Sequence, residues 1–247
     1  MSHTKIKTIF IGTSDFGIPA LRALAKDKQF EIIAVITQPD KPTGRKQILT
    51  PPPIKAEAEK YQIPIFQPEQ IKNLQTEISA QGECASGAKN LKSDIIIVAA
   101  YAQIIPEEIL NLPKYGCINI HGSLLPKYRG AACVQAAILN GDGQTGVTIM
   151  KMDKGLDTGP ILWQDKINIE SRDTAGALYE KLSRLGAKIL PIVIKKYIAG
   201  VIKPIAQDNA RASYVKRLKK QDGLIDWAKS AVEIERFIRA MAPWPSA

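Results

Sequence analysis

Short runs of apolar residues alternate along this chain with stretches whose apolar residues recur every three or four positions. The runs predict β-strands, and the helical periodicity of the intervening stretches predicts α-helices. Residues 94–100 are apolar on both faces, as expected of a central strand in a parallel sheet. We therefore predict an α/β fold with a Rossmann-like, doubly wound, mostly parallel sheet. The expected strands are residues 7–11, 32–37, 64–66, 94–100, 117–121, 145–152 and 161–169, and the expected helices are 18–26, 54–61, 104–111, 131–140, 173–199 (capped by Asp173 and interrupted at Pro191) and 231–241.

Polar residues of chemical interest lie in the stretch CINIHGSLLPKYRGA, residues 117–131. Side chains alternate faces along a strand, so Asn119 and His121 project to the same side. Ile118 and Ile120 face the other way, where they can be buried. Ligands of open parallel sheets bind at the carboxyl ends of the strands, which is where this pair stands. The pair therefore predicts a site, although a hydrogen-bonded core histidine beside a turn-forming asparagine gives the same pattern.

A turn that contains a candidate carboxylate joins the strands expected at 145–152 and 161–169. Gly155 and Gly159 flank Leu-Asp-Thr, and this spacing imposes a specific turn that can aim one carboxylate inward. A lone aspartate in a turn usually makes local hydrogen bonds. Beside an asparagine and a histidine, Asp157 becomes a candidate for acid–base chemistry, and Asp153 is open to the same role on proximity alone.

Residues 38–53 combine proline, glycine and cations at a density that excludes a helix or a central strand, so they predict an exposed loop. Lys41, Arg45 and Lys46 make this loop a cationic arm. A solvated surface loop fits the same composition. The formal net charge of +10 favours a polyanionic partner such as nucleic acid, but only as a hint.

The cysteine pattern and the hydropathy pattern argue against several classes of protein. Cys84, Cys117 and Cys133 are odd in number and lack C-x-x-C spacing, so neither a disulfide framework nor a zinc site is predicted. The first residues show no signal-peptide pattern, and no stretch approaches the roughly 20 apolar residues that span a bilayer. We therefore expect a cytoplasmic protein with no membrane partner.

Three motifs together resemble those of the folate-dependent formyltransferases, most closely the members that modify tRNA: NIHGSLLPKYRGAA at 119–132, GVTI at 146–149 and GLDTG at 155–159. The resemblance covers nearly the whole chain. It implies a formyltransferase catalytic domain at 1–205 and a C-terminal extension and linker at 206–247, with the family's C-terminal β-barrel domain absent. It also implies transfer of a formyl group, without a metal, from 10-formyltetrahydrofolate to the α-amino group of methionyl initiator tRNA.

The resemblance assigns catalysis to Asn119, His121 and Asp157, the second of the two turn acids. It assigns folate binding to the loop after the catalytic strand and to the end of the strand at 94–100, that is, to Ser123, Leu124, Leu125, Pro126 and Tyr101. Simple packing of the loop and of the aromatic ring would explain these five residues as well.

The resemblance identifies the cationic arm with an inserted loop that reaches the tRNA acceptor stem. Arg45 is then the main tRNA-binding candidate, with Lys41 and Lys46 in support. The amine acceptor is expected near the turn that carries Asp15 and Phe16.

Other functions stay open from the sequence. A formyltransferase acting on an amino sugar nucleotide shares the catalytic signature, and hydrolysis of formylfolate to formate is a further alternative. A noncatalytic module that binds RNA or a nucleotide is the alternative outside the enzyme class. The cationic arm and the tail through Pro245 favour the tRNA enzyme, which we expect to be a monomer.

Overall fold

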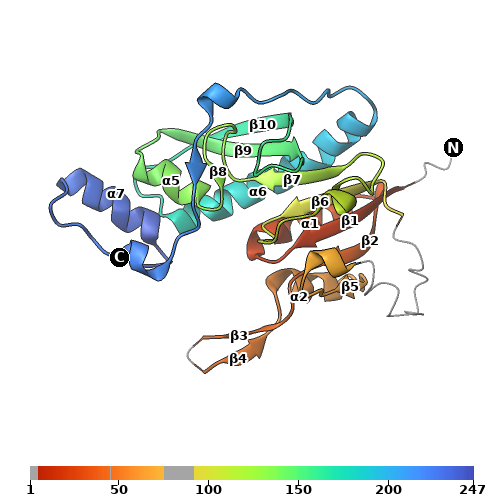
Figure 1. The fold of residues 1–247 in the computed structure, drawn as a ribbon, viewed down its shortest axis with the longest axis horizontal. Coiled ribbons are helices and arrows are strands. Elements are labelled where there is room, and N and C mark those ends of the chain that lie inside the picture. The colour runs from red at the N-terminus through yellow and green to blue at the C-terminus, as the bar shows by residue number, and fades with distance from the viewer. Residues whose placement is uncertain (1–4, 45, 75–91) are drawn as a thin grey trace.

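Seven strands form one mixed sheet in the computed structural model, which describes residues 5–44, 46–74 and 92–247. The strand order is β10-β9-β7-β6-β1-β2-β5 (Figure 1). Strands β5, β2, β1, β6 and β7 pair in parallel, and β9 and β10 extend the sheet in antiparallel fashion beyond β7. The predicted α/β, mostly parallel fold is confirmed. The bounds are β1 Ile6–Gly12, β2 Phe30–Ile36, β5 Ile65–Phe66, β6 Ile95–Ala99, β7 Cys117–His121, β9 Gln144–Lys151 and β10 Ile161–Asn168.

Helices cover the sheet, and the alternation of strand residues divides the core into two clusters. On one face, α1 (Ile18–Lys26), α2 (Pro53–Glu59), α5 (Cys133–Leu139), α6 (Ala175–Ile198) and α7 (Ala231–Met241) bury residues such as Phe10 and Ile118. On the other face, α4 (Glu107–Leu110) and the 3-10 turn η2 (Ile71–Asn73) pack near Ile9 and Ile96. Asn119 and His121 point to this second face because Ile118 and Ile120 occupy the first.

Helix α6 differs from the expectation at its start and at its proline. Thr174, one residue after Asp173, is the N-cap, and its hydroxyl accepts a hydrogen bond from the Ala177 N–H. Asp173 is instead buried and paired with Lys181. The helix continues through Pro191 to Ile198. Pro191 and its neighbours Leu190 and Val193 are buried, and their packing offsets the loss of the one helical hydrogen bond that proline cannot donate.

The cationic arm is a β-hairpin, where the composition predicts only a loop. Strands β3 (Lys41–Thr43) and β4 (Ile48–Thr50) pair in antiparallel fashion, and the hairpin projects from the body of the molecule (Figure 1). Its base is held by Asp40, which accepts hydrogen bonds from Lys55 Nζ (2.8 and 2.9 Å) and Gln67 Nε2 (2.7 Å). The arm therefore leaves the sheet on a firmly anchored stem.

The segment after α6 returns to the sheet. A bridge joins Ile205 to Ile161, and the short strand β11 (Tyr214–Val215) pairs with β8 (Arg129–Gly130). The 3-10 turns η3 (Asn209–Arg211) and η4 (Lys220–Gly223) then lead to α7, and η1 (Asp15–Gly17) precedes α1. In the part of the chain that the structure describes, none of the helices has the length and hydropathy of a membrane span.

Candidate active site

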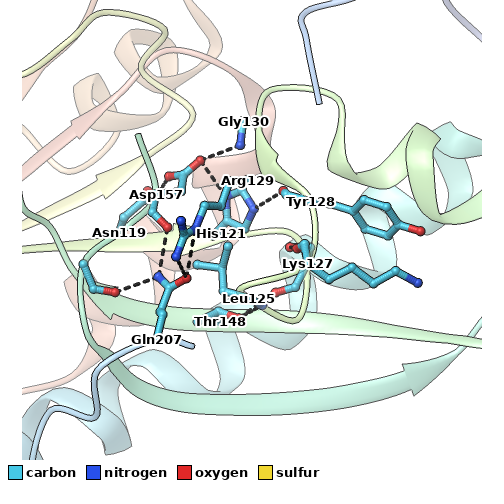
Figure 2. Close-up of polar contacts among 12 residues, drawn as sticks. Asn119, His121, Leu125, Lys127, Tyr128, Arg129, Gly130, Thr148, Asp157 and Gln207 are labelled. Carbon is cyan, nitrogen blue, oxygen red and sulfur yellow. Dashed lines mark hydrogen bonds and ion pairs between the residues drawn. The ribbon is translucent and has the colours of Figure 1, made fainter. Parts of the chain in front are cut away.

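Asn119 and His121 lie at the carboxyl end of β7, next to the carboxyl end of β6 and the carboxyl half of β9. In the register of the sheet, Asn119 is opposite Val98 on one side and Met150 on the other, and His121 is opposite Thr148. The loop of residues 122–130 and the turn of residues 153–160 reach the same rim (Figure 2). The expected polar pair is therefore present, on the expected face.

Asp157 joins this pair, so the structure brings together the three residues to which the resemblance assigns catalysis. Asn119 Nδ2 donates to Asp157 Oδ1 over 3.4 Å, and His121 Nδ1 lies 3.6 Å from Asp157 Oδ2 (Figure 2). The Gly130 N–H donates to Asp157 Oδ2 at 2.8 Å. The side chains of His121 and Asp157 are only 6% and 13% exposed. Charges that develop here are therefore weakly screened by water.

The hydrogen bond of the His121 ring defines its tautomer. His121 Nε2 lies 3.0 Å from the Tyr128 carbonyl oxygen. A carbonyl oxygen only accepts, so we assign a proton to Nε2. The ring atom that faces Asp157 is then Nδ1, and it can donate only when the ring carries its second proton.

The geometry distinguishes the two acids of the turn. Asp153 Oδ1 accepts from the Gly155 N–H (3.0 Å) and from Thr158 Oγ1 (2.6 Å), so this carboxylate stabilises the turn itself. Asp157 has a positive φ of 52°, and this uncommon backbone conformation directs its carboxylate toward the rim. Gly159 permits the turn, because a Cβ there would stand 1.9 Å from the Lys151 carbonyl oxygen.

The predicted folate loop is built largely by hydrogen bonds within the protein. Ser123 is fully buried, and its hydroxyl donates to the Lys127 carbonyl oxygen at 2.6 Å. Leu125 is also buried, and its N–H donates to Thr148 Oγ1 at 3.0 Å. Leu124 and Pro126 keep part of their surface exposed. Apolar contact with a ring system is therefore open to these two, and folate binding by the loop stays a prediction.

Tyr101 follows β6 as a packed aromatic. Its side chain is 2% exposed and belongs to the core cluster of the second face. Its carbonyl oxygen accepts hydrogen bonds from Thr13 Oγ1 (3.2 Å) and Gln38 Nε2 (2.9 Å). Tyr101 thus ties the end of β6 to the ends of β1 and β2, and its expected place in the wall of a folate pocket stays a prediction.

The turn after β1 is held by a residue that the sequence did not single out. The Tyr179 hydroxyl, from α6, lies 2.9 Å from Ser14 Oγ, donates to Asp15 Oδ1 at 3.0 Å and accepts from the Phe16 N–H at 3.2 Å. Its ring contacts the Phe16 ring with 5.0 Å between centroids. Burial, followed by the nearby Asp15 carboxylate, raises the pKa of Tyr179, which keeps the hydroxyl neutral as a hydrogen-bond hub.

The cations of the hairpin are exposed where they are described. Lys41 Nζ donates to Gln38 Oε1 at 2.6 Å, and this hydrogen bond holds the ammonium group at the base of the arm. Lys46 lies exposed in the hairpin turn. Arg45, the main tRNA-binding candidate, lies outside the described residues. The role of all three stays a prediction.

Two further residues support the site without having been predicted. Gln207 Nε2 donates to the carbonyl oxygens of Asp157 (2.9 Å) and Gly159 (2.7 Å). Arg129, which is 1% exposed, donates to Gln207 Oε1. Arg129 lies inside the central motif, but its partner is almost 80 residues further along the chain, and no local pattern marks a lone glutamine.

Among the described residues, no group of three or more His, Cys, Asp or Glu side chains forms a potential metal site.

A family model described as "Formyl transferase" matches residues 4–194, and one described as "Formyl transferase, C-terminal domain" matches residues 217–247. Similar curated proteins include the methionyl-tRNA formyltransferases of Bacillus velezensis, 46% identical, and Bacillus subtilis, 44% identical. Each match covers 98% of this chain and 73% of the relative. The second family match extends the resemblance into residues that we assigned to an extension and linker.

Solved structures of the same fold include sugar formyltransferases. WlaRD, a sugar 3N-formyl transferase crystallised in the presence of dTDP and 5-N-formyl-THF, has a TM-score of 0.71 and 28% identity, covering 95% of this chain and 78% of that one. The N-formyltransferase from Helicobacter canadensis, in complex with folinic acid and dTDP-3-aminofucose, has a TM-score of 0.70 and 25% identity, with coverage of 95% and 80%.

Proposed function

Because this chain belongs to the formyl transferase family, among its methionyl-tRNA formyltransferases, we propose that it moves the formyl group of 10-formyltetrahydrofolate to the α-amine of methionyl initiator tRNA. The observation that carries the proposal is the convergence of Asn119, His121 and Asp157 at one rim of the sheet. An amide donor, an imidazole and a carboxylate are the groups that this transfer needs.

The reaction exchanges one C–N bond for another. The amine nitrogen bonds to the formyl carbon, and the bond from that carbon to the folate nitrogen breaks. The amine loses one proton and the folate nitrogen gains one. Between the two steps the formyl oxygen carries negative charge, so the site must stabilise an oxyanion and move one proton.

Asn119 and His121 are the proposed oxyanion donors. The Asn119 amide has two hydrogens, and one of them makes the long 3.4 Å contact with Asp157, which leaves the other for the oxyanion. His121 can donate from Nδ1 when the ring is protonated, since Nε2 donates to the Tyr128 carbonyl oxygen and the 3.6 Å between Nδ1 and Asp157 Oδ2 is too long for a hydrogen bond. A preplaced donor of this kind contributes about 10²–10³ in rate.

Asp157 is the proposed proton-handling group. One of its oxygens is fixed by the Gly130 N–H, and the same oxygen faces His121 Nδ1. The carboxylate can therefore stabilise the protonated ring and, through a water molecule, relay the proton of the attacking amine. General acid–base catalysis of this kind contributes about 10²–10⁴ in rate.

The remaining binding roles form part of the same proposal. Folate contacts would come from residues 123–126 and from Tyr101. The methionyl end would lie near Asp15 and Phe16, where Tyr179 holds the turn. The acceptor stem would meet the hairpin through Arg45, Lys41 and Lys46.

Two substitutions test the catalytic assignment. His121→Ala and Asn119→Asp should each lower kcat for formylation by at least about 10²-fold, because each removes an oxyanion donor. Circular dichroism should show an intact fold, and folate affinity should change little. Asn168→Asp, the same change at the far end of β10, is the matched control and should keep kcat within about twofold. Near-normal turnover of His121→Ala would remove this residue from the mechanism.

The acceptor is tested by competition. The purified protein is given formylfolate together with methionyl initiator tRNA and an amino sugar nucleotide, and the formylated products are separated. We expect the formyl group on the tRNA. A formylated sugar, release of free formate, or RNA binding without product would support instead a sugar formyltransferase, a hydrolase or a noncatalytic module, respectively.

A further inference from the structure

Residues 205–215, which we call the strap, run back across the loops of the active site. Ile205 exchanges two backbone hydrogen bonds with Ile161, at 2.7 and 2.9 Å. Further along, the Arg129 N–H donates to the Ser213 carbonyl oxygen (2.8 Å), and the Ser213 N–H donates to that of Pro126 (3.3 Å). The strap is thus paired at both ends with elements that carry the site.

Gln207 is the residue through which the strap contacts the turn of residues 153–160. Its amide nitrogen donates to the carbonyl oxygens of Asp157 and Gly159, at 2.9 and 2.7 Å (Figure 2). Asp157 has a positive φ, a conformation that non-glycine residues keep only where the surroundings enforce it. Two hydrogen bonds from one amide group supply part of that enforcement.

Arg129 determines which way the Gln207 amide points. Its Nε and Nη2 donate to Gln207 Oε1 at 3.1 and 2.8 Å, and an arginine cannot accept. The oxygen of Gln207 must therefore face Arg129, and its NH₂ group must face the turn. Arg129 also donates to Asn209 Oδ1 and to the Tyr214 hydroxyl, both at 2.8 Å. The buried guanidinium is thereby locked by three residues of the strap.

Gly130 completes a second connection from Arg129 to the carboxylate. Its N–H donates to Asp157 Oδ2, and its φ of 104° suits glycine. A Cβ at this position would stand 2.3 Å from the Val215 carbonyl oxygen. The strap and β8 therefore approach as closely as their backbones allow, and they hold Asp157 from its backbone and from its side chain.

We propose that Gln207 is a positioning residue for formyl transfer. It holds the Asp157 turn so that the carboxylate stands between Asn119 and His121, and Arg129 holds Gln207 in the required orientation. This inference rests on the proposed function, since it assigns Gln207 no chemistry of its own. Its effect must pass through Asp157.

The first test separates turnover from binding. Gln207→Ala removes the hydrogen bonds to the turn and the acceptor of Arg129. The turn can then shift, and a displacement of about 1 Å at a catalytic group can cost about 10²-fold in rate. We expect kcat to fall about 10–100-fold, with KM for folate and for tRNA within about twofold. Gln29→Ala is the matched control, because this exposed glutamine stands just before the amino end of β2, at the opposite rim of the sheet. Its kcat should be unchanged.

A double-mutant cycle tests the route of the effect. Single-turnover formylation is measured for Asp157→Asn, Gln207→Ala and the double variant. If Gln207 acts through the carboxylate, adding Gln207→Ala to Asp157→Asn should cost less than about threefold. Independent effects would multiply instead, and that result overturns the proposal.

Gln207→Glu distinguishes an effect on turnover from a loss of folding. The glutamate keeps an acceptor for Arg129 but places an oxygen, not an N–H, against the two carbonyl groups. We expect a melting temperature close to that of the wild type together with slow turnover. Activity that falls only in proportion to folded protein in both variants would make Gln207 merely structural. A normal kcat for Asp157→Asn would refute the role proposed for Asp157, and an absence of formylated tRNA with the wild type would refute the proposed function, whereas a normal kcat for Gln207→Ala alone refutes only this inference.

Discussion

The two oxygens of Asp157 have different surroundings, and this asymmetry decides what the residue can do. Oδ2 accepts the Gly130 N–H at 2.8 Å and faces His121, whereas Oδ1 has the longer contact with Asn119. The first oxygen is therefore fixed and the second is the freer one. This division suits the role proposed for Asp157, which is to stabilise a neighbouring imidazolium and also to exchange a proton.

Substituting the two acids of the turn separately distinguishes their roles. Asp157→Asn should lower kcat by about 10²–10⁴-fold, because an amide can neither take a proton nor stabilise the charged ring. Asp153→Asn keeps the oxygen that accepts from Gly155 and Thr158, so its kcat should stay within about threefold. Steady-state formylation of methionyl-tRNA measures both. Equal losses in the two variants would contradict the choice of Asp157.

At the scale of elements, the sequence predicted strands and helices whose residues follow a strong local pattern. It did not predict contacts between residues that are far apart along the chain. β7 and α7 have the predicted bounds, because alternation in one and helical periodicity in the other are properties of neighbouring residues. The convergence of Asn119 and His121 followed from the same alternation. Gln207 and Tyr179 could not be predicted, since their partners at Asp157 and Phe16 are 50 and 163 residues away. The hairpin pairing was also missed, because proline-rich composition hides two short edge strands.

The contact between α1 and α2 carries a pH-dependent part of the stability. Arg22 Nε and Nη2 donate to the two oxygens of the buried Glu57, at 2.6 and 2.8 Å, and Lys60 adds a third contact at 2.9 Å. The hydrogen bonds from Arg22 lower the pKa of Glu57 from 4.5 to about 2, despite its burial. A depressed carboxylate pKa stabilises the fold above about pH 4.5, and this contribution is lost as the pH falls toward 2.

Glu57→Gln should remove that pH dependence. Between pH 6 and 3 the wild type should lose about 1–2 kcal/mol more of its free energy of unfolding than the variant does, allowing for screening of the half-exposed Arg22. Urea denaturation at each pH measures the difference. Glu59→Gln, an exposed position on the same helix, is the control and should follow the wild type. Parallel curves for the wild type and Glu57→Gln would show that the ion pair contributes nothing.

At the scale of the whole molecule, the catalytic part and the residues after it are not separable at the boundary that we proposed. The division into 1–205 and 206–247 remains a proposal, but the strap crosses it and supports the Asp157 turn. The strap also lies between the two family matches, which end at residue 194 and begin at residue 217. Gln207 therefore joins the residues after position 205 directly to the turn that carries Asp157.

The net charge of +10 and the exposed cations of the hairpin predict that tRNA recognition depends on salt while folate recognition does not. Each phosphate contact releases counterions, so raising the salt from 50 to 200 mM should increase KM for methionyl-tRNA by roughly tenfold or more. KM for formylfolate should stay within about twofold, because the binding of a small ligand releases few counterions.

The slope of log KM for tRNA against log salt then tests the hairpin. If Arg45 contacts a phosphate, Arg45→Ala should reduce this slope by about one. Lys28→Ala removes one positive charge at an exposed position after α1, and it should leave the slope unchanged. An equal reduction in both variants would mean that only the total charge of the protein matters. A reduction confined to Arg45→Ala would instead place the RNA at the arm, because counterion release counts local contacts and not the overall charge.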